Sequence, residues 1–285
     1  MGENGEMQRA GSARFQEMHK MGAGFVMPNP WDAGSARILE QMGFAALATT
    51  SAGCAVSAGY RDGVAAVSRA MILENAAAIV AAVDVPVSAD LEDGFGPAPE
   101  VCAETVRLAA GVGLAGGSIE DVTGGPDGGV YEIAEAADRV AAAVEAAQEV
   151  GFVLTARSEN YLVGRPDLRD TIARLQAYGE AGADVLYAPA LPDLDAIRTV
   201  CAEVDKPVNV VMGLRAPLYS VTELQEAGVA RISVGGSMAR AAYGALQRAA
   251  AEILGQGSFG YAAEAMPGAE LMGMMRGDAL DKRDL

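Results

Sequence analysis

The sequence predicts a single (β/α)₈ barrel, and three observations support this fold. Short β-rich runs alternate with Ala-rich helical segments along the whole chain. Eight strand candidates can be counted, each followed by a helical segment, which is typical of the barrel rather than of a doubly wound sheet. No Pro-rich linker, block of charge or change in composition divides the chain, so we expect one domain over residues 1–285.

The strands are predicted where β-branched and apolar residues form short runs, and the helices where apolar residues recur at helical spacing. The predicted strands are Gly24–Met27, Ala46–Thr50, Pro86–Ala89, Gly116–Glu120, Phe152–Ala156, Asp184–Tyr187, Pro207–Val211 and Arg231–Val234. The predicted helices include Ser68–Val83, Pro99–Val112, Glu132–Val150, Leu168–Ala181, Leu194–Glu203, Val221–Ala227 and Met238–Leu254. We expect residues 1–22 to form a helical extension that covers the barrel, and residues 255–285 to form a C-terminal arm.

The C-terminal arm is rich in methionine. Met266, Met272, Met274 and Met275 lie there among glycines. Such a segment is more typical of an arm that packs on a neighbouring subunit than of a cofactor-binding motif, because methionine fills irregular apolar contacts. We therefore expect a homo-oligomer.

The composition limits the classes of partner. A net charge of -17 would repel phosphate backbones and anionic lipids, so neither nucleic acid nor a membrane surface is an expected partner. Cys54, Cys102 and Cys201 are too few and too scattered for a disulfide framework or a zinc cluster. The first residues lack a leader pattern, and no apolar run reaches the length of a membrane span, so we expect a soluble cytoplasmic protein.

The chain contains one histidine, His19, in the predicted N-terminal helix. This excludes a His-centred triad from the core of the chain, and also His-rich metal sites. We expect His19 to be a surface residue rather than a catalyst.

An acidic run follows the third predicted strand. Asp90, Glu92 and Asp93 stand within four positions and are followed by glycines. Carboxylates packed this closely repel one another unless a cation or a proton lies among them, and hard divalent metals prefer oxygen ligands. Taken alone, the run is equally compatible with a metal site and with a solvated acidic turn.

Polar residues also follow the other predicted strands, and in a barrel the carboxyl ends of all strands meet at one face. The second strand ends in Thr49–Gly53 and its loop reaches Asp62, the fourth ends in Glu120 and Asp121, and the fifth continues through Arg157–Asn160. Only Arg61 and Arg157 offset these acids at the predicted barrel mouth. A divalent cation with an anionic ligand would relieve the repulsion.

Five separated motifs together resemble the isocitrate lyase / phosphoenolpyruvate mutase superfamily from about Asn29 to Tyr243. They are Asn29–Ala33, Thr50–Gly53 with Tyr60–Gly63, Ala89–Gly96, Ile119–Asp121 and Ala156–Asn160. The resemblance implies an enzyme that requires Mg²⁺, with Mn²⁺ as an alternative, and acts on a small anionic 2-oxo or 2-hydroxy acid. It also implies a dimer or tetramer in which the C-terminal helices exchange between subunits.

The resemblance assigns roles residue by residue. The implied metal ligands are Asp90, Glu92 and Glu120, with Asp90 binding directly. The implied catalytic residues are Asp62, Glu120 and Arg157. The implied substrate-binding residues are Trp31, Thr50, Ser51, Ala52, Asp62, Arg157 and Asn160. For Trp31, plain core packing is an open alternative.

Two departures from the superfamily pattern narrow the expected reaction. The loop Val122–Val130 contains no Cys, Lys or His, whereas lyases of the superfamily use a loop cysteine as acid or base. The sixth strand ends in Ala188–Ala190 where those lyases have a glutamate. We therefore expect C–C cleavage or decarboxylation of a small acid through a metal-stabilised enolate, and not cleavage of isocitrate or 2-methylisocitrate. The alternatives are an enzyme of phosphonate P–C bonds and a non-catalytic oxo-acid binding protein.

Three further features have competing interpretations. Cys54 is expected to be a buried structural thiol rather than a nucleophile. Ser237, after the eighth strand, is expected to be a helix N-cap rather than part of a phosphate site. The glycines of Gly124–Gly129 favour a lid over the site.

Overall fold

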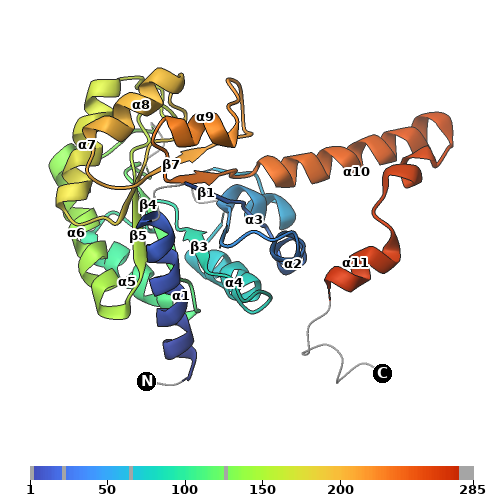
Figure 1. Ribbon diagram of the computed structural model, residues 1–285, viewed down its shortest axis with the longest axis horizontal. Coiled ribbons are helices and arrows are strands. Elements are labelled where there is room, and N and C mark those ends of the chain that lie inside the picture. The colour runs from blue at the N-terminus through green and yellow to red at the C-terminus, as the bar shows by residue number, and fades with distance from the viewer. Residues whose placement is uncertain (1–2, 21–23, 64–66, 125–127, 276–285) are drawn as a thin grey trace.

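Eight parallel strands form one sheet that closes almost completely into a barrel, which confirms the predicted fold (Figure 1). The computed structural model describes residues 3–20, 24–63, 67–124 and 128–275. The strand order is β1-β8-β7-β6-β5-β4-β3-β2, so the first and last strands pair. A hydrogen bond of 3.0 Å from the Ala48 amide to the Pro28 carbonyl joins the two ends of the sheet.

All eight strands lie within the predicted regions or extend them by one residue. They are β1 Phe25–Met27, β2 Leu47–Ala48, β3 Val87–Asp90, β4 Gly116–Glu120, β5 Val153–Arg157, β6 Val185–Tyr187, β7 Val208–Val211 and β8 Arg231–Ser233. The helices are α1 Glu3–Lys20, α2 Ala33–Gln41, α3 Ser51–Ser57, α4 Arg69–Val80, α5 Pro99–Gly111, α6 Ile133–Val150, α7 Leu168–Glu180, α8 Leu194–Glu203, α9 Val221–Glu226, α10 Ser237–Gln256 and α11 Gly268–Met274, with a 3₁₀ turn at Gly260–Glu264. The helices that follow the strands surround the sheet (Figure 1). Because all the strands are parallel, their carboxyl ends lie at one face of the barrel.

Helix α1 covers the opposite, N-terminal end of the barrel. Gln8 of α1 donates to the carbonyls of Leu114 and Gly151, which precede β4 and β5. Phe15 is fully buried in a cluster with apolar residues of the strands. The burial of this aromatic ring fixes α1 on the barrel, and α1 shields the N-terminal end of the barrel from water.

His19 is buried, so the expectation of a surface residue was wrong. Its ring meets Phe15 and Phe25 edge-on, at centroid distances of 4.8 and 5.1 Å. Nε2 lies 3.2 Å from the Arg231 guanidinium, which can only donate, so the ring carries its proton on Nδ1 and donates it to the Phe15 carbonyl. Burial, and then the Arg231 charge, lower the pKa of His19 to about 3. The helical pattern alone did not show that this face of α1 enters the barrel.

Helix α10 leaves the barrel and projects away from it (Figure 1). Within α10 only Ala239 is buried. The helix begins at Ser237 with Gly236 at the N-cap and no side-chain cap, so the prediction of Ser237 as N-cap was wrong. Exchange of this helix between subunits stays a prediction. No helix in the described part of the chain is long and apolar enough to cross a membrane.

Candidate active site

A cavity of 1670 Å³ opens at the carboxyl ends of the strands. Its walls include eight of the residues predicted for the site: Thr50, Ser51, Ala52, Asp62, Asp90, Glu92, Glu120 and Arg157. They come from β3, β4 and β5 and from the segments after β2 and β3. Parallel strands end together at one face of a barrel, which brings these residues close to one another. The fold thus brings together side chains more than a hundred positions apart in the sequence, such as Thr50 and Arg157.

Ser51 and Asp90 face each other across two neighbouring strands. Thr50 caps the short helix α3 by accepting from the Gly53 amide at 3.3 Å, which turns the first residue of α3, Ser51, toward β3. The Ser51 hydroxyl donates to Asp90 Oδ2 at 2.8 Å and its amide donates to the same oxygen at 3.3 Å. A hydroxyl and an amide that converge on one carboxylate oxygen are also suited to a substrate carboxylate.

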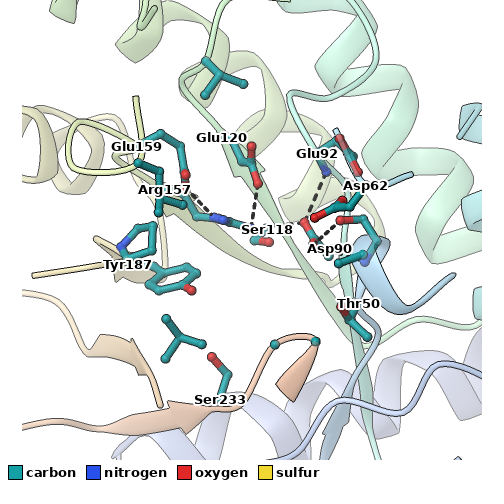
Figure 2. A pocket seen from close by; sticks show the side chains of 18 of the residues that line it. Thr50, Asp62, Asp90, Glu92, Ser118, Glu120, Arg157, Glu159, Tyr187 and Ser233 are labelled. Carbon is teal, nitrogen blue, oxygen red and sulfur yellow. Dashed lines mark hydrogen bonds and ion pairs between the residues drawn. The ribbon is translucent and has the colours of Figure 1, made fainter. Parts of the chain in front are cut away.

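Arg157 lies at the centre of the acidic residues (Figure 2). Its Nη1 is 3.1 Å from Asp90 Oδ1 and 2.7 Å from Glu120 Oε1, and its Nε is 2.8 Å from Glu159 Oε1. Its guanidinium also stacks on the Tyr187 ring, 4.8 Å from the centroid. Four contacts fix the arginine in one orientation, so it acts as a rigid anchor for acidic groups.

Glu92 connects the acidic run to β4. Its backbone is in the left-handed region, with φ of 51°, which costs a residue other than glycine about 1–3 kcal/mol. The Glu92 carbonyl accepts from the Glu120 amide at 2.9 Å, which holds this conformation. Strain of this kind is typical of a functional site, and here it sets the Glu92 side chain at the cavity wall beside Asp90.

The carboxylates outnumber the positive charge. Burial, and then the charge of Asp90, raise the pKa of Glu92 to about 7. Burial also raises the pKa of Glu120 far above its usual range, although Arg157 opposes this effect, and raises the pKa of Glu159. Burial and mutual repulsion thus disfavour the ionised acids, and a cation among them would relieve both effects.

The residues fit a hard divalent cation by their chemistry. Asp90, Glu92 and Glu120 offer oxygen ligands only, which suits Mg²⁺ rather than zinc. In the described ranges of the chain, no three Asp, Glu, His or Cys side chains are already arranged around one position that a metal ion could occupy. Mg²⁺ commonly keeps several waters and binds one or two carboxylates directly, so it does not require such a preformed group.

Asp62 lies at the rim of the cavity on the loop after α3. Its side chain is exposed, but partial burial and then the nearby charge of Asp90 raise its pKa. An acid with a raised pKa at the rim is suited to exchanging protons between substrate and solvent.

Two residues predicted to bind substrate do not line the cavity. Asn160 is fully buried and its amide donates to Asp170 at 2.7 Å and Thr171 at 3.2 Å, on the far side of β5. Trp31 packs behind Gly53 and tilts against the Tyr243 ring at 6.5 Å. Both side chains support the wall of the site rather than forming its surface.

The predicted lid segment has an ordered base. Val122 and Val130 form an antiparallel bridge, and the Thr123 amide donates to the Gly129 carbonyl at 2.8 Å. Thr123, Gly124, Gly128 and Gly129 line the cavity. The centre of the segment, residues 125–127 with Asp127, lies outside the described residues.

Cys54 is buried in α3, and it is not among the residues that line the cavity. Burial raises the pKa of its thiol. It therefore fits the structural role expected for it.

Sequence reasoning missed several polar residues of the cavity wall, among them Tyr187, Asn209, Arg231 and Ser233. These four belong to β6, β7 and β8, which the sequence predicted as strands without assigning them a role in the site. Alternation along the strands is the signal that could have found them, since Arg231 and Ser233 lie two positions apart on one face of β8.

Comparisons with known proteins agree on one group of enzymes. The family model described as phosphoenolpyruvate phosphomutase matches residues 15–254. A solved structure from Burkholderia cenocepacia J2315, described as a candidate lyase/mutase, is 51% identical, covers 96% of this chain and 98% of its own, and superposes with a TM-score of 0.92. A 2-methylisocitrate lyase of Shewanella oneidensis is 30% identical over 78% of both chains. A 2,3-dimethylmalate lyase of Eubacterium barkeri is 28% identical over 76% of this chain and 77% of its own.

Proposed function

This chain belongs to the phosphoenolpyruvate phosphomutase family, in the isocitrate lyase/PEP mutase superfamily of enzymes, and on that premise we propose that it is a Mg²⁺-dependent lyase of small 2-oxo or 2-hydroxy acids. The observation that supports this most is the position of Arg157 between Asp90 and Glu120, with Ser51 beside them. This arrangement joins a binding group for a carboxylate to oxygen ligands for a cation. The superfamily is generally dependent on divalent metals.

Different residues of the site bind the substrate, hold the cation and transfer the proton. Arg157 and the Ser51 donors bind the carboxylate of the substrate, once Asp90 turns from Ser51 toward the cation. Mg²⁺, held by Asp90 with Glu92 and Glu120, would supply positive charge where negative charge develops as the bond breaks. Asp62, at the rim, accepts the proton of a 2-hydroxyl group.

The same residues favour a small substrate over the tricarboxylic acids. Cleavage of 2-methylisocitrate needs a proton donor on the departing product, and the described part of the loop Val122–Val130 carries no thiol, imidazole or amine. The segment Ala188–Ala190, after β6, contains no carboxylate where lyases of the superfamily carry a glutamate. General acid catalysis is worth about 10²–10⁴ in rate, so the tricarboxylates should react slowly.

A turnover screen tests the proposal. The protein is incubated with Mg²⁺ and, in parallel, with oxaloacetate, substituted malates, 2-methylisocitrate and phosphonopyruvate, and release of the 2-oxo acid and of phosphate is measured. We expect oxo-acid release from oxaloacetate or a substituted malate, and loss of that release in excess chelator. Phosphate release from phosphonopyruvate alone would assign the P–C bond chemistry instead, and a 2-methylisocitrate rate equal to that of the smaller acids would contradict the inference from the loop.

A further inference from the structure

The Tyr187 hydroxyl is a polar group that the site contains and the proposed mechanism does not yet use. Tyr187 is the last residue of β6 and is 8% exposed. Among the described residues, its hydroxyl has no hydrogen-bond partner. The buried side-chain atoms without a partner are Ser158 Oγ and Asn160 Oδ1, so the unpartnered Tyr187 hydroxyl is not one of the atoms shielded from solvent. The Tyr187 hydroxyl therefore opens on the cavity that Tyr187 lines.

The ring that carries this hydroxyl is held firmly. Tyr187 and Arg157 are partners in the register of β5 and β6, and the guanidinium lies 4.8 Å from the ring centroid. Figure 2 shows the ring between Arg157 and Ser233, with its hydroxyl directed into the open space that the acidic residues face. Because the backbone and the stacked arginine both fix the ring, the hydroxyl is aimed before any ligand binds.

Two positive charges act on the phenol. Arg157 stacks on the ring. Arg231 also lines the cavity, and it lies close enough to Tyr187 for the guanidinium charge to interact with a phenolate. Arg231 has no carboxylate partner in the described part of the chain; it donates to Asn209 at 2.8 Å and to Thr155 at 2.9 Å. The charge of Arg157 is shared with its three carboxylate partners, so Arg231 is the cation that stabilises the phenolate for the short time in which it exists.

We propose that Tyr187 is a catalytic residue, the proton donor to the departing carbon of a small acid; it lies on β6 and not on the loop, and it does not restore the loop donor for the tricarboxylates. The inference rests on the proposed function. For a 2-hydroxy acid, Asp62 takes the hydroxyl proton, the C–O bond becomes a carbonyl, and the C–C bond breaks with its electron pair on the departing carbon. That carbon takes the phenol proton, and the phenolate is reprotonated from Asp62 through water. Protons and electrons balance without any further reactant.

Other donors in the chain fit this step less well. Cys54 is not on the cavity surface, and His19 lies at the opposite end of the barrel. Glu92 and Glu120 belong to the wall that holds the cation. Burial raises the pKa of Tyr187, so the phenol carries its proton over the whole pH range in which enzymes work.

The test compares Tyr187→Phe with Tyr219→Phe. Phenylalanine keeps the ring that packs on Arg157 and removes only the hydroxyl. Tyr219 provides the matched control, because its hydroxyl accepts from the Leu194 amide at 3.1 Å away from the cavity. We expect kcat to fall about 10²–10³-fold in Tyr187→Phe. The KM, the affinity for oxalate and the melting temperature should stay near the wild-type values, and Tyr219→Phe should retain kcat.

The fate of deuterium separates proton donation from a structural role. In D₂O, with whichever 3-substituted malate the wild type cleaves, Tyr187 should deliver deuterium to one face of the departing carbon, so the product is a single enantiomer. In Tyr187→Phe, water becomes the donor and the residual product should be a mixture of enantiomers. A kcat within about threefold of wild type, or an unchanged single enantiomer, overturns the assignment. A wild type that cleaves no acid overturns the proposed function itself, and this inference with it.

Discussion

At the scale of single residues, Arg157 decides how the acids of the site can lie together. It pairs with Asp90, Glu120 and Glu159 while almost fully buried. Removing one partner of a buried ion pair leaves uncompensated charge and costs about 3–5 kcal/mol. We expect Arg157→Met to lose activity and to lower the melting temperature of the metal-free protein, whereas Arg157→Lys keeps the charge and loses less stability. Equal melting temperatures for Arg157→Met and wild type would contradict this account of the acidic cluster.

Substitutions of Asp90 and Asp93 test the proposed metal site, because both residues belong to the acidic run but only Asp90 is proposed to bind the cation. Asp90 faces Ser51 and Arg157, whereas Asp93 Oδ1 accepts from the Phe95 amide at 2.8 Å and shapes the loop. We expect Asp90→Ala to abolish Mg²⁺ binding and turnover, and Asp93→Asn to retain both. Calorimetric titration with Mg²⁺ measures the first effect directly. Normal Mg²⁺ affinity in Asp90→Ala would exclude it as the direct ligand.

Glu92 should make the stability of the metal-free protein depend on pH. Its pKa rises from 4.5 to about 7 on folding, so between these values the folded state holds a proton that the unfolded state has released. The stabilising contribution is complete below about pH 4.5 and is lost as the pH rises through 7. We expect Glu92→Gln to remove this part of the decline in melting temperature between pH 5 and 8. An identical pH profile in the variant would show that Glu92 is not the group that titrates.

The sequence was sufficient to predict most of the acidic wall, because acids that follow buried strands are conspicuous against their surroundings. Asp90, Glu92, Glu120 and Arg157 all line the cavity. It was not sufficient for Asn160, because its amide is directed by tertiary contacts with Asp170 that the local pattern does not encode.

At the scale of secondary-structure elements, the eight strands could be predicted because short β-rich runs alternate with longer Ala-rich helical segments along the chain. Helices α2 and α3 could not, since they are short and rich in small residues. The start of α3 matters for the site: Thr50 caps it and thereby orients Ser51 toward Asp90. A segment expected to be a loop is thus the first turn of a helix.

Helix α1 is predicted to depend on His19 for its attachment to the barrel. The His19 ring accepts from Arg231, and its loss leaves a buried guanidinium N–H without that partner, which costs about 1–3 kcal/mol. We expect His19→Leu to lower the free energy of unfolding, measured by urea denaturation, while the exposed control Gln16→Ala leaves it unchanged. Equal stability of His19→Leu and wild type would show that the contact does not hold α1.

The same histidine gives a pH signature. Because its pKa falls from 6.5 to about 3 on folding, the unfolded state binds a proton below pH 6.5 that the folded state does not accept. Stability should therefore decline as the pH falls from 6.5 toward 3, and His19→Leu should lack this contribution.

At the scale of the whole molecule, α10 and the segment after it present apolar side chains that a single chain leaves in water. Leu246, Leu254, Phe259 and Met272 are each 60% exposed or more. Apolar surface on a projecting helix is typical of a subunit interface. We expect a dimer or tetramer in sedimentation experiments, and dissociation on replacing Leu254 and Phe259 by glutamate. A wild-type mass equal to one chain at micromolar concentration would contradict this.

In the proposed function, the carboxyl end of the barrel binds an oxo acid through a divalent cation and Arg157 together. Oxalate, a flat dianion that resembles the enolate of pyruvate, should bind tightly to such a site because it mimics the species that the enzyme stabilises. Oxalate binding by calorimetry, with Mg²⁺ and with chelator, is the most direct measurement. We expect binding to wild type that requires Mg²⁺ and is lost in Arg157→Met. Oxalate binding of equal strength in chelator, or no binding to the Mg²⁺-loaded wild type at millimolar oxalate, would contradict the claim.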